Sequence, residues 1–232
     1  MSRRRLLIWR HGRTEWNATS RVQGQQDVAL DEVGVRQAAE AAPLLALERP
    51  ELIVSSDLRR AHDTAKALAE HLGLEITLDK RIRERCFGDW EGLSSTELAE
   101  QYPEAYARWR AGHDPEAPGI ESQEQMTARI ASAIEDALDA TTGTVCLVTH
   151  GGAVKRALAD LFGWPADVPW GLEPLGNCRW AALQRRNDTR WRLQSYNVGV
   201  TAPVGAASSM PASADVEPDI DRSAPPVATR EA

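Results

Sequence analysis

Residues 6–12 read LLIWRHG, an apolar run of four residues that leads directly into Arg10, His11 and Gly12. The run does not alternate apolar with polar residues, which is typical of a strand covered on both faces. Runs of this kind recur further along the chain. They are residues 52–55 (LIVS), 75–78 (EITL) and 145–148 (VCLV). The sequence therefore predicts these four strands in a mainly parallel sheet.

Helical patterns separate the strands. Apolar residues recur at helical spacing in several stretches, and Gly73 stands where one of these helices should end. The stretches are residues 35–47, 57–71, 122–138 and 151–162. Pro43 is expected to kink the first of these helices or to end its first half. Residues 180–183 and 191–196 flank a turn and predict a terminal hairpin. The alternation of strands and helices predicts an α/β fold.

The composition changes near Val200. Residues 201–232 are rich in Ala, Pro, Ser and acidic residues and show no apolar periodicity. Such a segment buries too little apolar surface to offset its ordering entropy. We therefore expect one domain over residues 1–200 and a disordered tail over residues 201–232.

Charge and apolar content limit the partners of the chain. Its formal net charge of −7 argues against nucleic acid, because phosphate backbones favour a basic surface. No apolar stretch approaches the roughly 18 residues of a membrane span, and residues 6–9 are too few for a signal peptide. The three cysteines are widely separated, which indicates reduced thiols. We expect a cytoplasmic protein without a nucleic-acid or membrane partner, and a homodimer stays open.

Polar residues gather at the predicted strand ends. The first strand leads into Arg10 and His11, the second into a segment that contains Arg60, and the fourth into His150. Ligands of open α/β sheets bind outside the carboxyl ends of the strands, so these four side chains should share one site. Arginine forks suit phosphate oxygens, and the glycines that follow His11 and His150 let backbone approach a ligand closely. The expected ligand is a phosphate group.

Several blocks of the sequence resemble the histidine phosphatase superfamily, which is also named after phosphoglycerate mutase. The blocks follow one another in the family's order across about residues 5–200. They are residues 10–17 (RHGRTEWN), 23–24 (QG), 30–38 (LDEVGVRQA), 55–61 (SSDLRRA), 83–84 (RE) with 87–92 (FGDWEG), and 148–152 (VTHGG). The resemblance implies a phosphoglycerate mutase-like, three-layer α/β/α fold with a mainly parallel central sheet.

The resemblance also implies catalytic roles. His11 would be the nucleophile that takes up the phosphoryl group, while Arg10, Arg60 and His150 would hold its oxygens. Glu84 would be the general acid, which protonates the leaving oxygen and then takes a proton from water. A protonated carboxyl calls for an apolar or anionic setting that raises its pKa.

Further residues are implied as contacts of the phosphate or substrate. They are Arg10, Asn17, Gln23, Gly24, Arg60, His150 and Gly151. No group of His, Asp and Glu has the spacing of metal ligands, so we expect neither a metal nor another cofactor. The expected reaction is metal-independent hydrolysis of a phosphomonoester on a small phosphorylated metabolite.

Three enzyme activities within the family are alternatives, and a fourth alternative is a protein without catalytic activity. Residues 85–92 (RCFGDWEG) resemble the phosphatase branch and not the mutases, although a cofactor-dependent phosphoglycerate mutase stays an alternative. Residues 55–65, Gly176-Asn177 and the tryptophan-bearing hairpin are similar to the actinobacterial glucosyl-3-phosphoglycerate phosphatases. An α-ribazole phosphatase or a broad sugar-phosphate phosphatase also stays open. The alternative without catalytic activity is a sensor that binds a phosphorylated ligand.

The substrate choice is expected to lie in residues 101–123, which should cap the site. Within them, residues 119–122 read GIES, where the family commonly has GGES.

Overall fold

Our computed structural model describes residues 4–165, 171–186 and 190–200. In this part of the chain, strands form one sheet in the order β3-β2-β4-β1-β5-β6. The strands are β1 (Arg5–Arg10), β2 (Pro50–Ser55), β3 (Ile76–Leu78), β4 (Thr144–Thr149), β5 (Trp180–Arg186) and β6 (Arg190–Val198). Strands β1 to β4 run parallel, and β5 and β6 are antiparallel additions at one edge. The predicted terminal hairpin is thereby confirmed.

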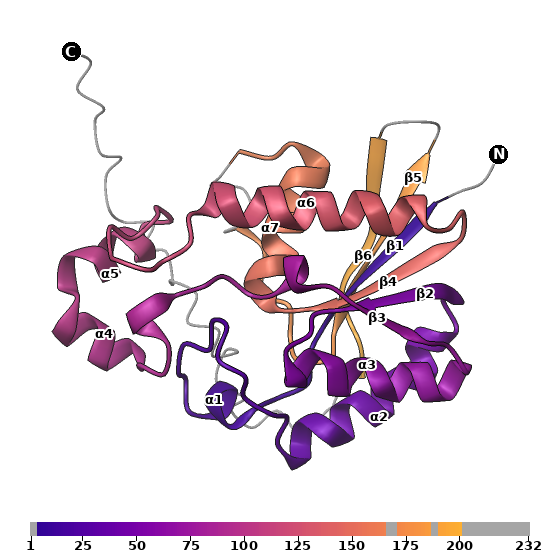
Figure 1. The fold of residues 1–232 in the computed structure, drawn as a ribbon, viewed down its shortest axis with the longest axis horizontal. Coiled ribbons are helices and arrows are strands. Elements are labelled where there is room, and N and C mark those ends of the chain that lie inside the picture. Colours follow the sequence, from indigo (N-terminus) through magenta and orange to yellow (C-terminus); the bar gives the residue numbers. More distant parts are fainter. Residues whose placement is uncertain (1–3, 166–170, 187–189, 201–232) are drawn as a thin grey trace.

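Helices cover both faces of the sheet, as Figure 1 shows. Helices α2 (Glu32–Ala46) and α3 (Arg59–Leu72) pack on one face, and α6 (Gln123–Asp139) and α7 (Gly151–Phe162) on the other. The residues of β1 divide between the two cores, because successive side chains of a strand point to opposite faces. Leu6 and Ile8 join the core under α6 and α7, whereas Leu7 and Trp9 join the core under α2 and α3. The three-layer α/β/α architecture is confirmed.

The strand register brings the predicted strand ends together. Strand β1 pairs in parallel with β4, and Arg10 stands opposite Thr149. The backbone N–H of His11 extends this pairing by donating to the Thr149 carbonyl at 2.9 Å. On the other side of β4, the N–H of Ser56 donates to the carbonyl of Val148 at 2.9 Å. Three chain segments therefore leave the sheet side by side.

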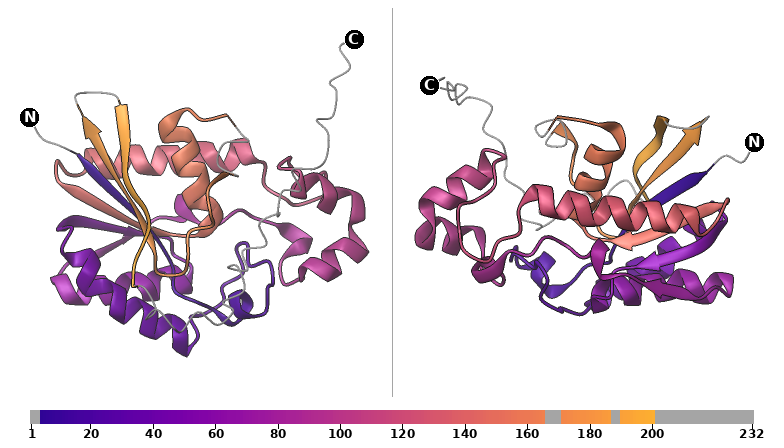
Figure 2. Two further views of the ribbon diagram at one scale, coloured as in Figure 1. Left: turned by 180° about the vertical axis from the view of Figure 1, so that it is seen from behind. Right: turned by 45° about the horizontal axis from the view of Figure 1, so that its top comes forward.

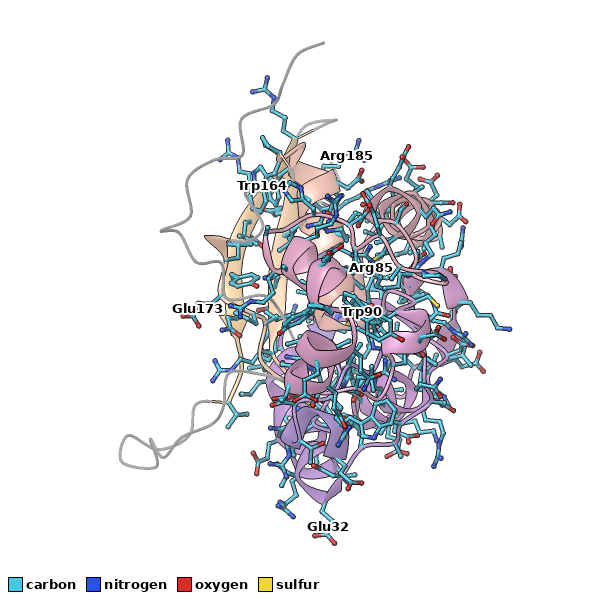
Figure 3. The ribbon with its side chains drawn as sticks, turned by 90° about the vertical axis from the view of Figure 1, so that its left-hand side faces the viewer. Glu32, Arg85, Trp90, Trp164, Glu173 and Arg185 are labelled. Carbon is cyan, nitrogen blue, oxygen red and sulfur yellow. The ribbon has the colours of Figure 1, made fainter. Side chains whose placement is uncertain are left out.

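A smaller lobe projects from one end of the sheet. Helices α4 (Ser95–Gln101) and α5 (Pro103–Arg110) stand apart from the layers in both views of Figure 2. Their interior is a separate apolar cluster around Trp90 and Trp109, whose rings meet edge-on with centroids 5.8 Å apart. Trp90 lies near the middle of the face in Figure 3. The lobe begins before the predicted cap of residues 101–123, because Ser94 already caps α4.

Short elements link these parts. They are α1 (Glu15–Ala18) and the 3₁₀ turns η1 (Lys80–Ile82) and η2 (Gly88–Trp90).

The structure corrects the sequence predictions in two elements. Pro43 neither ends nor halves the first long helix, which runs from Glu32 to Ala46. The ring of Pro43 is on the exposed side, while Ala42 and Leu45 beside it are buried against the sheet and hold the helix together. Strand β3 is not covered on both faces, since the consecutive side chains of Thr77 and Leu78 are both exposed. The predicted tail, residues 201–232, lies outside the described residues.

Two glycines allow the loop after β1 to approach α2. A Cβ on Gly34 would lie 2.0 Å from the carbonyl oxygen of Arg13, and one on Gly12 would lie 2.5 Å from the carbonyl oxygen of Gly34. Both obstacles are backbone atoms, which cannot swing aside as a side chain can. The position of the loop that carries His11 therefore depends on these two glycines.

We predict that Gly34→Ala lowers the free energy of unfolding by about 1–3 kcal/mol, because the added methyl group forces the two backbones apart. Gly171→Ala is the matched control. A Cβ there meets no atom within 4 Å, so its effect should stay within about 0.5 kcal/mol. Urea unfolding of both variants measures the difference, and equal stabilities would contradict the packing argument.

Candidate active site

His11 lies just beyond β1 with 1% of its surface exposed. Its Nδ1 is 2.7 Å from the carbonyl oxygen of Gly12. A carbonyl can only accept, so Nδ1 carries the proton and donates it. The lone pair of the ring is therefore on Nε2. The N–H of Gly12 donates to Thr64 Oγ1 at 2.9 Å, which fixes the same turn to α3.

His150 lies next to His11, with ring centroids 5.1 Å apart. It is the N-cap of α7 and is fully buried. Its Nδ1 accepts a hydrogen bond from Arg60 Nε at 3.2 Å, and its Nε2 is 2.9 Å from Ser56 Oγ. An arginine N–H can only donate, so the His150 proton is on Nε2. The two imidazoles therefore hold opposite tautomers.

Positive charge surrounds both rings. Burial lowers the pKa of His11 well below its usual range, and the charges of Arg60 and Arg10 lower it further. Burial likewise lowers the pKa of His150, again with Arg60 as the first charge that contributes. Both histidines are thus neutral at physiological pH. A neutral imidazole with a free lone pair beside two guanidiniums is a nucleophile in a site built for anions.

Residues 175–179 hold the end of β1 from the other side. The Arg10 N–H donates to the Arg179 carbonyl at 3.0 Å, and Arg10 Nη1 donates to the Leu175 carbonyl at 2.6 Å. The His11 carbonyl accepts from the N–H of Cys178 at 3.2 Å and from Asn177 Nδ2 at 3.1 Å. The backbone of both Arg10 and His11 is thus fixed on two sides.

Asn17 and Gln23 contribute buried amides to the loop region, each with 4% of its surface exposed. Asn17 Oδ1 accepts from the N–H and the hydroxyl of Thr14, both at 3.1 Å, and from Asn177 Nδ2 at 3.3 Å. This sets the orientation of the amide. Among the described residues, Asn17 Nδ2 and both amide atoms of Gln23 are buried without a hydrogen-bond partner. Buried polar groups of this kind are expected to meet a ligand or water.

The loop that contains Gly24 anchors Arg60. Its Nη2 donates to the carbonyl of Gly24 and its Nη1 to that of Gln26, both at 2.7 Å. Gly24 has a φ of +51°, and a Cβ there would lie 2.1 Å from Glu91 Oε1. Glycine adopts this left-handed backbone without strain and leaves room for Glu91, and its carbonyl orients the guanidinium of Arg60.

Glu84 lies between η1 and η2, and its carboxylate reaches the start of α7 at Gly152, two residues beyond His150. Its Oε2 accepts from the Gly152 N–H at 2.9 Å and its Oε1 from the Arg85 N–H at 2.8 Å. The expected apolar or anionic setting is therefore not what the structure has, because two backbone donors face the carboxylate. The Gly152 N–H at the start of α7 therefore donates to Glu84 and not to a bound phosphate.

The structure brings together the four residues that were predicted to share a site because they follow strand ends. Arg10, His11, Arg60 and His150 are all fully or almost fully buried in one cluster. Three further residues complete it and were not predicted as site residues: Ser56, Thr64 and Asn177. Each stands in or beside a block that resembles the family, but its hydrogen bonds depend on contacts between distant segments. Within residues 4–165, 171–186 and 190–200, no His, Cys, Asp or Glu cluster could hold a metal ion.

This fold and this site define an α/β enzyme for phosphate esters, and comparison with known proteins identifies its family. A model of the histidine phosphatase superfamily (branch 1) matches residues 6–199. The glucosyl-3-phosphoglycerate phosphatase of Mycolicibacterium vanbaalenii is 38% identical over 212 residues, which are 84% of this chain and 94% of that protein. The structure of a mycobacterial glucosyl-3-phosphoglycerate phosphatase with VO3 has a TM-score of 0.77 and 40% identity, and the match covers 84% of this chain and 100% of that one. The metal-independent phosphoserine phosphatase of Arabidopsis thaliana is 41% identical over 155 residues, 65% of each chain.

The chain belongs to the histidine phosphatase superfamily. The predictions of family, fold and phosphatase activity on a small phosphorylated metabolite are confirmed. In the part of the chain that the structure describes, no helix is both long and apolar enough to cross a bilayer.

We predict that the two rings keep opposite tautomers at about pH 6, His11 protonated on Nδ1 and His150 on Nε2. Both stay neutral as the pH falls through 6.5, because the pKa of each lies well below that value in the folded protein. Long-range ¹H–¹⁵N spectra of the ring nitrogens distinguish the two tautomers, and His11→Asn and His150→Asn provide the assignments. A doubly protonated ring at either position at this pH would contradict the electrostatic argument.

Proposed function

We propose that this phosphatase works through a phosphohistidine at His11 and that its substrate is glucosyl-3-phosphoglycerate. One observation carries the mechanism. The Gly12 carbonyl holds the proton of His11 on Nδ1, which leaves the Nε2 lone pair for attack, while burial and two arginines keep the ring neutral. The similarity to the Mycolicibacterium vanbaalenii enzyme over 84% of the chain supports the choice of substrate.

In the first step, His11 Nε2 forms a bond to phosphorus as the bond from phosphorus to the leaving oxygen breaks. The Glu84 carboxyl gives its proton to that oxygen. The substrate itself favours the protonated carboxyl, because a phosphate dianion beside Glu84 opposes a second negative charge. The Gly12 carbonyl stabilises the positive charge that develops on the ring.

In the second step, water attacks phosphorus and the bond from phosphorus to His11 Nε2 breaks. Glu84 takes the proton of the water and is ready for the next cycle. Inorganic phosphate leaves, and His11 returns to the neutral tautomer in which it began. No metal or other cofactor takes part in either step.

The transferred phosphoryl group carries its charge on three oxygens, which the cluster would hold. Arg10, Arg60 and His150 supply cationic and ring N–H donors. Asn17 Nδ2 and the Gln23 amide are suited to the same task, because they are buried without a partner among the described residues. Gly24 acts through its carbonyl on Arg60. Gly151, which follows His150 as the first residue of α7, is proposed as a further contact of the phosphate.

We further propose that residues 1–200 are the catalytic domain, which agrees with the family match over residues 6–199. A cytoplasmic location is proposed with it, and the three free thiols support a reducing compartment.

We predict that the wild type releases phosphate from p-nitrophenyl phosphate in EDTA, and that His11→Ala lowers kcat by at least about 10³-fold. The exposed His71 at the end of α3 provides the control, since His71→Ala should keep the wild-type rate. Phosphohistidine is stable in base and hydrolyses in acid. After reaction with ³²P-labelled substrate, the wild type should therefore retain label when it is quenched in base and lose it when it is quenched in acid. Turnover by His11→Ala near the wild-type rate would refute the mechanism.

We predict that glucosyl-3-phosphoglycerate has the highest kcat/KM in a panel with 3-phosphoglycerate, phosphoserine, α-ribazole phosphate and hexose phosphates. The preference should reach about tenfold or more, which corresponds to roughly 1.4 kcal/mol of differential transition-state binding. Interconversion of 2- and 3-phosphoglycerate after priming with a bisphosphate would indicate a mutase. A panel hydrolysed uniformly would reject the proposed substrate and leave the phosphohistidine mechanism in place.

A further inference from the structure

The segment that carries Glu84 has no regular secondary structure to hold it. It lies between η1, which ends at Ile82, and η2, which begins at Gly88. Its backbone carbonyls therefore need partners from elsewhere in the molecule. Thr149 Oγ1 donates to the carbonyl of Ile82 at 2.6 Å, which ties the segment to the end of β4.

Arg129 of α6 supplies partners for three neighbouring carbonyls. Its Nη1 donates to the carbonyls of Arg81 and Arg83, both at 2.7 Å, and its Nη2 donates to that of Glu84 at 2.9 Å. Together with Thr149, this guanidinium accounts for the carbonyls of four consecutive residues. The Glu84 carbonyl also accepts from Gln25 Nε2 at 3.1 Å, but Arg129 is the side chain that bonds to three of these four carbonyls.

Glu121 completes the arrangement. Its Oε1 accepts from Arg129 Nε at 2.5 Å and its Oε2 from Arg129 Nη2 at 2.7 Å. Glu121 Oε2 is also 3.2 Å from the Cys86 N–H, and the N–H of Glu121 donates to the Cys86 carbonyl at 2.9 Å. Glu121 thus fixes both Arg129 and the backbone on the far side of Glu84. Residues 119–122 (GIES) differ from the family's GGES at Ile120 but share its glutamate, Glu121.

The five hydrogen bonds of Arg129 correspond to the five N–H groups of a guanidinium. No donor remains for a substrate oxygen, so Arg129 acts on the protein and not on the ligand. Its side chain is 18% exposed and that of Glu121 14%, which keeps the pair largely out of water. A lysine has one ammonium group and cannot reproduce this planar set of donors.

We propose that Arg129, oriented by Glu121, is a positioning residue that fixes the Glu84 carboxyl for proton transfer. The inference rests on the proposed function, in which Glu84 is the general acid. Catalytic groups must be held within about 0.5 Å of the productive geometry, and misplacement by about 1 Å can lower a rate by roughly 10²-fold. Loss of the three carbonyl contacts would release the backbone that sets this geometry.

The test uses two substrates of nearly the same shape, p-nitrophenyl phosphate and phenyl phosphate. p-Nitrophenolate departs readily as an anion, whereas phenolate gains from protonation by the acid. The ratio of kcat/KM for phenyl phosphate to that for p-nitrophenyl phosphate therefore reports proton transfer to the leaving oxygen. A general loss of structure lowers both values and leaves the ratio unchanged.

We predict that Arg129→Lys lowers this ratio at least about fivefold, part of the roughly 10²–10⁴-fold that a positioned acid contributes. Glu84→Gln should lower the ratio further, and adding Arg129→Lys to Glu84→Gln should not change it again. Lysine keeps the positive charge, which matters because the charge of Arg129 also lowers the pKa of His150. Arg4→Lys is the matched control, since Arg4 forms a surface ion pair with Asp139 at the far end of α6 and should keep the wild-type ratio.

Each outcome decides one question. If Glu84→Gln lowers the ratio but Arg129→Lys does not, or if Arg129→Lys lowers both kcat/KM values equally, the positioning role is overturned. If Glu84→Gln leaves the ratio unchanged, the proposed acid is wrong and the proposed function fails at that step. Should Arg129→Lys fail to fold, Glu121→Gln takes its place, because it loosens the same guanidinium, and an unchanged ratio in that variant overturns the inference.

Discussion

The parallel pairing of β1 with β4 is the constraint on which the site depends. It sets Arg10 opposite Thr149, and the N–H of His11 continues the ladder by one hydrogen bond to the Thr149 carbonyl. His11 follows β1 and His150 follows β4, so the two histidines lie at the same end of these two neighbouring strands. A shift of register by one residue would turn every side chain of the strand to the opposite face and separate the two imidazoles.

The chemistry follows from keeping two histidines neutral among guanidiniums. An exposed imidazole near neutral pH is partly protonated, and its cationic form has no lone pair with which to attack. Burial and the neighbouring charges of Arg60 and Arg10 disfavour that form of His11. The charges that would hold a phosphate therefore also help burial to keep the nucleophile neutral, so binding and activation share one of their causes.

The sequence predicts the layers and the four central site residues because both are local patterns. An apolar run followed by Arg10-His11 or by His150 identifies a buried strand and its end without any knowledge of the fold. The environment of Glu84 could not be predicted in this way. Its partners are the N–H of Gly152, reached through α7, and the carbonyl contacts of Arg129, reached through α6. The helix end predicted at Pro43 is also wrong, because the helix continues to Ala46 with Ala42 and Leu45 buried against the sheet.

The lobe formed by α4 and α5 has an interior of its own, around Trp90 and Trp109, and shares none of its buried residues with the two cores of the sheet. Substitutions at well-separated positions act almost independently. The lobe can therefore exchange side chains over evolutionary time while the histidine cluster stays as it is. Side chains on the outer surface of α4 and α5 can in this way change without disturbing the packing of either core of the sheet.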